Sequence, residues 1–190
     1  MKFELQASNM SGVLVIFSAL CVSVSVVNAA NFGMGVWNTI AINKCEEDSH
    51  IFKFDITLVT INDTHDGCKG HIVLDEDFNH DYGVRIEICK IEDGNCKQSQ
   101  MVADKCLIDF FETYAKEKVE DFLKAIQNMD VTEMPIPKGE YDIEDYVFSN
   151  EPTLSMFGMY DITLFVLKGD TEVGCIQSRL EFKKTEEDDK

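Results

Sequence analysis

Basic residues are scarce in this sequence, and the shortage limits the partners that the protein can bind. Lysine and arginine together number 17 against 35 aspartates and glutamates, which gives a formal net charge of −18. So negative a surface repels the phosphates of nucleic acids and of anionic membranes, and it favours solubility. Part of the charge lies in the segment TEEDDK, which is typical of a frayed terminus. We therefore expect no nucleic-acid partner.

Sequence motifs of catalysis are also missing. The chain has no GxSxG elbow, no HExxH helix, no glycine-rich phosphate loop, and no His-Asp pair after a cysteine of the kind that a secreted phospholipase needs. Neighbouring carboxylates such as Glu144 and Asp145 arise by chance in so acidic a chain and indicate solvated surface. We expect no enzymatic activity and no cofactor, and a small secreted hydrolase is the least favoured class.

Histidine and cysteine do not show the spacing of a structural zinc site. No two cysteines are separated by two to four residues, and His50, His65, His71 and His80 form no helical pair with an acid. Surface and turn positions are typical of such histidines, so we expect no metal.

The N-terminal residues predict a secretory signal. Residues 12–27 are almost entirely apolar or small, and the run ends in Val27-Asn28-Ala29, which suits signal peptidase. A membrane anchor is the alternative, but the run is short for a span of ~20 residues and no second apolar segment of that length follows. We expect residues 1–30 to be cleaved and the mature protein to be secreted and extracellular.

Nothing in the composition divides the rest of the chain. It has no linker rich in Pro, Gly or Ser and no internal repeat. About 160 residues are enough for one domain with its own core. We expect one domain over residues 31–183, followed by an acidic tail over residues 184–190.

An even number of cysteines remains after the signal, which predicts disulfides in a secreted chain. Six cysteines allow fifteen pairings. Cys89 ends an alternating strand and Cys96 follows the turn IEDGN, so a bond between these two is geometrically easy. The six residues are Cys45, Cys68, Cys89, Cys96, Cys106 and Cys175.

One motif predicts a covalent modification. Asn62 begins the triplet Asn-Asp-Thr in a turn-rich segment, which is an acceptor for N-glycosylation in a secreted protein.

Alternating apolar residues predict a mainly β domain. Strand patterns cover residues 52–58, 84–88, 141–148, 160–167 and 176–182, with a weaker one at 71–74. One helical pattern begins near Asp104, repeats every three or four residues up to Met129, and ends before two prolines. We expect a single-domain antiparallel β-sandwich or β-cup, linked by disulfides, with one amphipathic helix.

The order of these features resembles a known family. Cys89, a tight loop, Cys96, and Cys106 at a helix start are followed by Pro-x-Pro-Lys-Gly-x-Tyr, Gly-x-Tyr-x-Ile and Val173-Gly174-Cys175-Ile176. This arrangement resembles the ganglioside GM2 activator, within the MD-2-related lipid-recognition proteins, and it is most similar to the insect chemosensory B proteins and related secreted proteins.

The resemblance implies a β-cup in which two antiparallel sheets hold acyl chains. It also implies a bond between Cys45 and Cys175 and another between Cys89 and Cys96. In the family, the cysteine that matches Cys106 pairs with one after the helix. This chain has no cysteine there, so the family's pattern leaves Cys68 as the partner of Cys106.

Apolar bulk on the predicted strands has two interpretations. It can line a cavity, or it can pack against the helix, which is the commoner outcome in sandwiches; the resemblance favours a cavity. Likewise, residues 149–158 form either a strand crossover or an exposed lip that touches lipid. The expected cavity lining is Phe54, Ile56, Leu58, Ile86, Ile88, Phe110, Tyr114, Ile162, Leu164 and Val166, and the expected mouth is Leu154, Met156 and Phe157.

Two functions of different classes follow. The first is a secreted, non-catalytic lipid-binding or transfer protein that holds a fatty acyl chain, glycolipid or hydrocarbon, makes transient membrane contact at its mouth and serves chemosensory signalling; each buried CH₂ would contribute ~0.8 kcal/mol. The alternative is a secreted interaction module with a filled core, which binds a protein receptor through its acidic surface.

Overall fold

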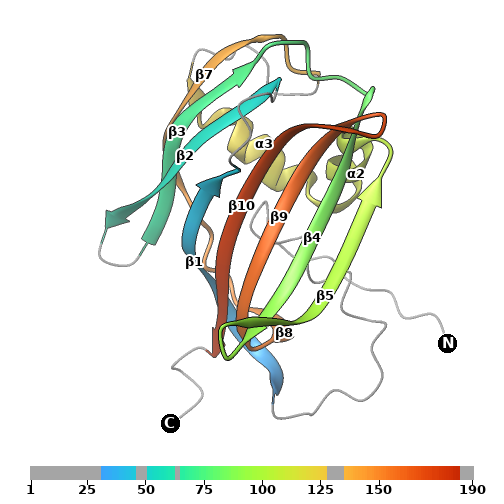
Figure 1. Ribbon diagram of the computed structural model, residues 1–190. Helices are drawn as coiled ribbons and strands as arrows, with labels where there is room; N and C mark the ends of the chain where they lie inside the picture. Colours follow the sequence, from blue (N-terminus) through green and yellow to red (C-terminus); the bar gives the residue numbers. More distant parts are fainter. Residues whose placement is uncertain (1–30, 46–50, 63–64, 128–134, 185–190) are drawn as a thin grey trace, which may run out of the picture.

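The computed structural model describes residues 31–45, 51–62, 65–127 and 135–184 (Figure 1). This part of the chain forms ten strands in one mixed sheet and two short helices. The prediction of a mainly β, disulfide-linked fold is confirmed. The expected signal at residues 1–30 lies outside the described residues, as does the expected acidic tail apart from Lys184.

The sheet divides into two wings that meet at one strand. The large wing has the order β8 (Thr153–Met156), β1 (Phe32–Lys44), β10 (Thr171–Lys184), β9 (Gly158–Lys168), β4 (Tyr82–Glu92) and β5 (Asn95–Asp104). The small wing has the order β2 (Phe52–Asn62), β3 (His65–Leu74), β7 (Gly139–Val147) and β6 (Ile126–Gln127). Within each wing every pairing is antiparallel.

The joint between the wings is narrow. Among the described residues, the strands of the two wings pair only through a parallel bridge between Gly174 of β10 and Phe52 of β2. A Cβ on Gly174 would lie 2.9 Å from the Phe52 Cβ and 3.2 Å from its carbonyl oxygen, so only glycine permits this approach. Beside it, Cys45 is bonded to Cys175 and fixes the end of β1 to β10.

The cysteine pairing agrees with the prediction for four residues and corrects it for two. The bonds Cys45–Cys175 and Cys89–Cys96 are both present. Cys68 and Cys106 are free thiols, so the predicted bond between them is wrong. Cys68 is buried in β3 between strand partners in β2 and β7. The Cys106 sulfur instead accepts a hydrogen bond from the backbone N–H of Asp109.

The helical prediction is right about the segment and wrong about a single helix. Two helices are present, α2 (Leu107–Tyr114) and α3 (Lys116–Lys124). They are separated by Ala115, whose backbone (φ −145°, ψ 20°) leaves the helical region and whose side chain is buried. α2 packs on β4 and α3 on β6, so the pair lies on one side of the sheet (Figure 1).

The segment 149–158 contains a short strand. Residues 153–156 form β8, which pairs with the start of β1 at the end of the molecule away from the helices (Figure 1).

No helix in the part of the chain that the structure describes is both long enough and apolar enough to cross a membrane.

We predict that the two disulfides contribute unequally to stability. The chain-entropy relation gives about 5 kcal/mol for the sequence separation of 130 residues closed by Cys45–Cys175, and roughly 2.4 kcal/mol for the separation of 7 closed by Cys89–Cys96. Denaturant unfolding of the paired alanine variants measures both losses under the same conditions. Equal losses would contradict the assignment of Cys45–Cys175 as the main covalent constraint.

Candidate functional site: an apolar cavity between the wings

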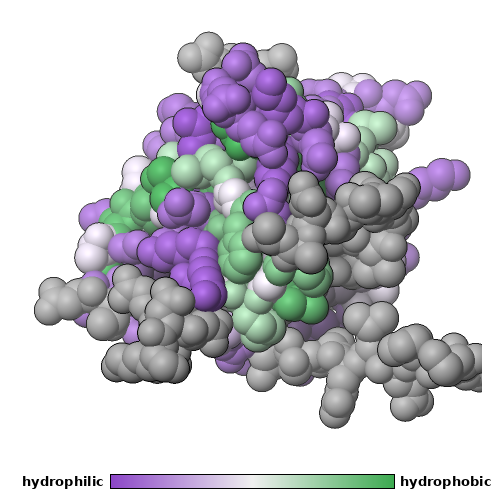
Figure 2. Space-filling view, turned by 90° about the horizontal axis from the view of Figure 1, so that it is seen from below, coloured by the Kyte–Doolittle hydropathy of each residue, from purple (hydrophilic) through white to green (hydrophobic). Residues whose placement is uncertain are grey.

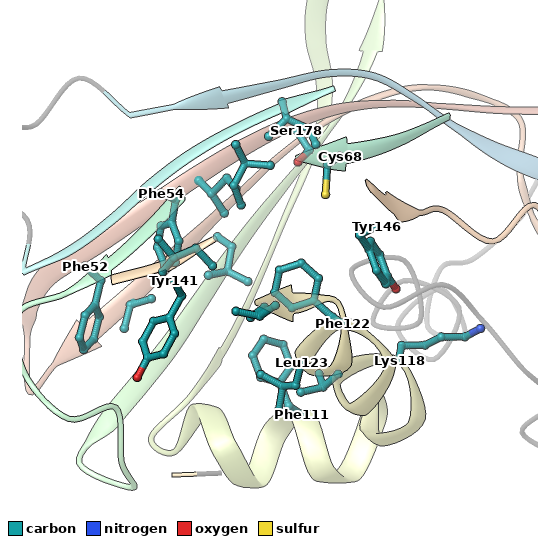
Figure 3. A pocket seen from close by; sticks show the side chains of 18 of the residues that line it. Phe52, Phe54, Cys68, Phe111, Lys118, Phe122, Leu123, Tyr141, Tyr146 and Ser178 are labelled. Carbon is teal, nitrogen blue, oxygen red and sulfur yellow. The ribbon is translucent and has the colours of Figure 1, made fainter. Parts of the chain in front are cut away.

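A cavity of about 250 Å³ lies between the diverging wings and beneath both helices (Figure 3). Its walls come from β1, β2, β3, β6, β7, β9, β10, α2 and α3. Alternate residues of the strands face it, because side chains two apart on a strand share one face. On β9 these are Ile162, Leu164 and Val166, and the alternation on β2 contributes Phe54 and Ile56.

Helix α3 supplies the other side of the cavity. Val119, Phe122 and Leu123 recur at three and four positions and so share one helical face, which points at the strands. Phe111 of α2 joins them, and Figure 3 shows these helical side chains opposite the strand side chains. The break at Ala115 lets each helix present its own apolar face to the same space.

Polar groups in the wall are few and mostly uncharged. The described lining contains no aspartate, glutamate or histidine, and its one charged side chain is Lys118. Lys118 and Tyr146 lie at one end of the cavity in Figure 3, and Tyr141 lies toward the other. The Tyr141 hydroxyl is satisfied there, because it donates a 2.6 Å hydrogen bond to the carbonyl of Pro137.

Burial keeps two titratable groups of the wall neutral. Burial raises the pKa of the Cys68 thiol to about 11. Burial also raises the pKa of the Tyr146 hydroxyl to about 12, with smaller contributions from the neighbouring Asp121 and Cys68. These two groups are therefore uncharged at neutral pH, and Lys118 is the charged side chain of the wall.

Three aromatic side chains connect the cavity to its surroundings, and we call them the aromatic rim. The Tyr146 ring makes edge contacts with Phe122 at 5.2 Å and with Phe148 at 6.0 Å between ring centroids. All three line the cavity and are half-buried, as is Lys118. Solvent therefore reaches the lining at the end where α3 faces β7.

Half of the residues expected to line a cavity do so. These are Phe54, Ile56, Ile162, Leu164 and Val166. The others lie elsewhere: Ile86, Ile88 and Phe110 are buried in the core outside the cavity wall, Leu58 is half-buried on β2, and Tyr114 is 44% exposed at the end of α2.

None of the residues expected at a mouth lines the cavity. Leu154 is 50% exposed on β8, opposite Met34 of β1, and Met156 lies opposite Phe32. Phe157 stacks on Phe182. These residues form an apolar surface at the β8 end, where Figure 2 shows hydrophobic side chains bordered by hydrophilic ones. The aromatic rim lies at the other end of the molecule, where α3 meets the small wing (Figure 1).

The sequence-based lining omitted residues of several elements, among them α3, β1 and β10. Val119, Phe122 and Leu123 carry a signal, because their spacing marks the apolar face of a helix that must cover something. Thr39 and Ser178 carry none, since a hydroxyl on a strand is typical of an exposed face.

Comparison with known proteins finds similarity among solved structures. No protein-family model matches the chain, and no curated protein matches it. Among solved structures, the chain is similar to chicken MD-1 in its crystal structure complexed with lipid IVa. The two are 11% identical, the match covers 77% of this chain and 98% of that one, and the TM-score is 0.29.

We predict that the two free thiols react at very different rates. At pH 8, raising the pKa of Cys68 from 9.0 to about 11 lowers its thiolate fraction roughly hundredfold, and burial restricts access further. Titration with a thiol reagent should therefore show a fast phase, removed by Cys106→Ser, and a slow phase, removed by Cys68→Ser. Denatured protein without any free thiol would show instead that the two cysteines are bonded.

Proposed function

We propose that the protein is a secreted, non-catalytic lipid-binding protein that holds one apolar chain in the cavity between its wings. The observation that carries the proposal is the apolar wall, built by both wings and both helices around about 250 Å³. Water in such a cavity would find few hydrogen-bond partners. The cavity therefore favours an apolar ligand.

The size of the cavity restricts the ligand. An apolar cavity of ~150 Å³ accepts benzene, and pockets for larger ligands span ~300–1,000 Å³. At about 250 Å³, the cavity lies between these two sizes. One fatty acyl or hydrocarbon chain fits this space better than a glycolipid with two chains. Each methylene buried there would contribute ~0.8 kcal/mol before the cost of association.

The composition of the wall supports binding rather than catalysis. General acid–base catalysis needs a titratable group in reach of the substrate, most often a histidine or a carboxylate. The described lining has neither, and its thiol and its phenols are neutral or hydrogen-bonded. The cavity also weighs against the alternative of a filled-core interaction module.

The disulfides support the finer proposal of a GM2 activator-like protein in extracellular fluid. Cys45–Cys175 and Cys89–Cys96 are the two pairs that the sequence resemblance implies. Disulfides persist in oxidising compartments, which agrees with a cleaved signal at residues 1–30. Asn62 is exposed at the end of β2, where a glycan would project into solvent.

We predict that partly filling the cavity weakens binding of an acyl ligand. In Leu164→Trp the indole would displace at least two methylenes of the ligand, worth ~1.6 kcal/mol, so the affinity for a fluorescent fatty acid should fall at least tenfold. The matched control is Leu154→Trp, which adds the same side chain on the exposed β8 surface and should bind normally. Thermal unfolding of both variants establishes that they fold.

Two outcomes would overturn the proposal. In the first, the wild-type protein shows no saturable uptake of the probe and no co-purifying lipid in native mass spectrometry. In the second, the folded Leu164→Trp variant binds the probe as tightly as the wild type. In the latter case the ligand occupies another surface, and the exposed Leu154 variant identifies whether it is the β8 end.

We predict that the secreted protein begins near residue 31 and carries one glycan at Asn62. Expression in a eukaryotic secretory host, with N-terminal sequencing and intact mass before and after N-glycosidase, measures both. Asn62→Gln should have the mass of the enzyme-treated protein. Retention of residues 1–30 in the secreted protein would refute the cleaved signal.

A further inference from the structure

A histidine, a cysteine and an aspartate meet outside the cavity, where the loop before β4 faces the start of α2. One ligand atom from each of His80, Cys106 and Asp109 lies within 4.8 Å of the other two. The Nε2 of His80 is 3.8 Å from the Oδ1 of Asp109. The Asp109 backbone N–H donates to the Cys106 sulfur over 3.5 Å.

The start of α2 aligns two of these side chains. Cys106 is the N-cap of the helix and Asp109 lies in its first turn, so both point out of the same helix end. The backbone N–H of Cys106 donates to the Asp104 carboxylate at 3.0 Å, which fixes the cap residue. The helix itself is anchored by Leu107 and Ile108, which are fully buried.

The loop that carries His80 is also fixed. Phe78 and Tyr82 flank the loop, are both buried, and stack with ring centroids 5.6 Å apart. Phe78 exchanges two backbone hydrogen bonds with Ile136, of 2.7 and 3.0 Å. Inside the loop, the N–H of Asp81 donates to the Asn79 side chain at 2.9 Å. The imidazole therefore projects from a backbone that is held on both sides.

We propose that His80, Cys106 and Asp109 bind a zinc ion, with water as the fourth ligand. Thiolate, imidazole and carboxylate are the zinc ligands of proteins, and three of them with one open position are a known arrangement. Bond lengths of ~2.0–2.3 Å in a tetrahedron separate the ligand atoms by roughly 3.3–3.6 Å. The 3.8 Å between His80 and Asp109 is close to those values, and all three ligand atoms lie within 4.8 Å of one another, so the site needs only a small contraction.

Access and charge favour the ion. His80 and Asp109 are 62% and 67% exposed, so a hydrated cation reaches both. The net charge of −18 raises the local concentration of cations at the surface. On binding, the Cys106 thiol releases its proton to solvent and the thiolate sulfur bonds the metal.

The site would act on the protein through α2. Zinc would join the first turn of this helix to the loop before β4, and the same helix lines the cavity with Leu107 and Phe111. Because the ion would bind the folded protein and not the dispersed ligands of the unfolded one, saturating zinc should raise the melting temperature by roughly 5 °C.

Cobalt substitution tests the ligands directly. Cobalt(II) added to the purified, reduced protein should give tetrahedral d–d bands and a thiolate-to-cobalt charge-transfer band, and one equivalent of zinc should remove both. Cys106→Ser keeps an N-cap side chain and should lose the charge-transfer band. His80→Ala and Asp109→Asn should each weaken cobalt binding at least tenfold.

His71→Ala is the matched control. His71 is an exposed histidine beside two carboxylates, 2.8 Å from Asp142 and 3.7 Å from Glu140, but it has no thiol. This variant should keep the full spectrum and the thermal shift. The proposal is overturned if the wild-type protein gives no charge-transfer band, if His80→Ala retains wild-type affinity, or if His71→Ala abolishes binding.

Discussion

The architecture depends on one close approach of two backbones. Gly174 and Phe52 form the bridge between the wings, and the absence of a Cβ on Gly174 allows β2 to reach β10 there. The adjacent residue, Cys175, is bonded to Cys45 at the end of β1. The wings are thus held together at one edge and diverge away from it. Between the diverging wings lies the apolar cavity.

The two helices cover apolar surface that the diverging wings leave open. The inner faces of β2 and β9 are apolar and would be exposed to water on the open side. Two helices lie on this side, and the break at Ala115 lets α2 pack on β4 while α3 packs on β6. The cavity is the space left between the strands and these two helices. Its volume is set by the side chains of the helices as much as by those of the strands.

The sequence predicts those elements that have one buried face and one polar face. β2 and β9 alternate clearly, so the strands and half of the cavity lining were found. The sequence does not predict β5, because this edge strand has no fully buried side chain. Without a buried face, apolar and polar residues do not alternate along a strand. Ile86 and Ile88 show the limit for the site: alternation identifies the buried face of β4, but these two residues lie in the core and not in the cavity wall. The grouping of His80 with Cys106 was equally invisible, because it depends on how a loop packs against a helix start.

The two helices that cover the cavity are anchored unequally. α2 buries Leu107, Ile108 and Phe110 and has its first turn fixed at the cap, whereas Leu123 is the one buried side chain of α3. Elements with few buried apolar contacts open at lower free energy than the core around them. α3 is therefore the weaker cover, and it adjoins the aromatic rim, where Phe122 and Tyr146 are already half-exposed. Under the proposed function, an apolar chain that enters there would displace α3 and leave the joint at Gly174 and the contact of α2 with β4 intact.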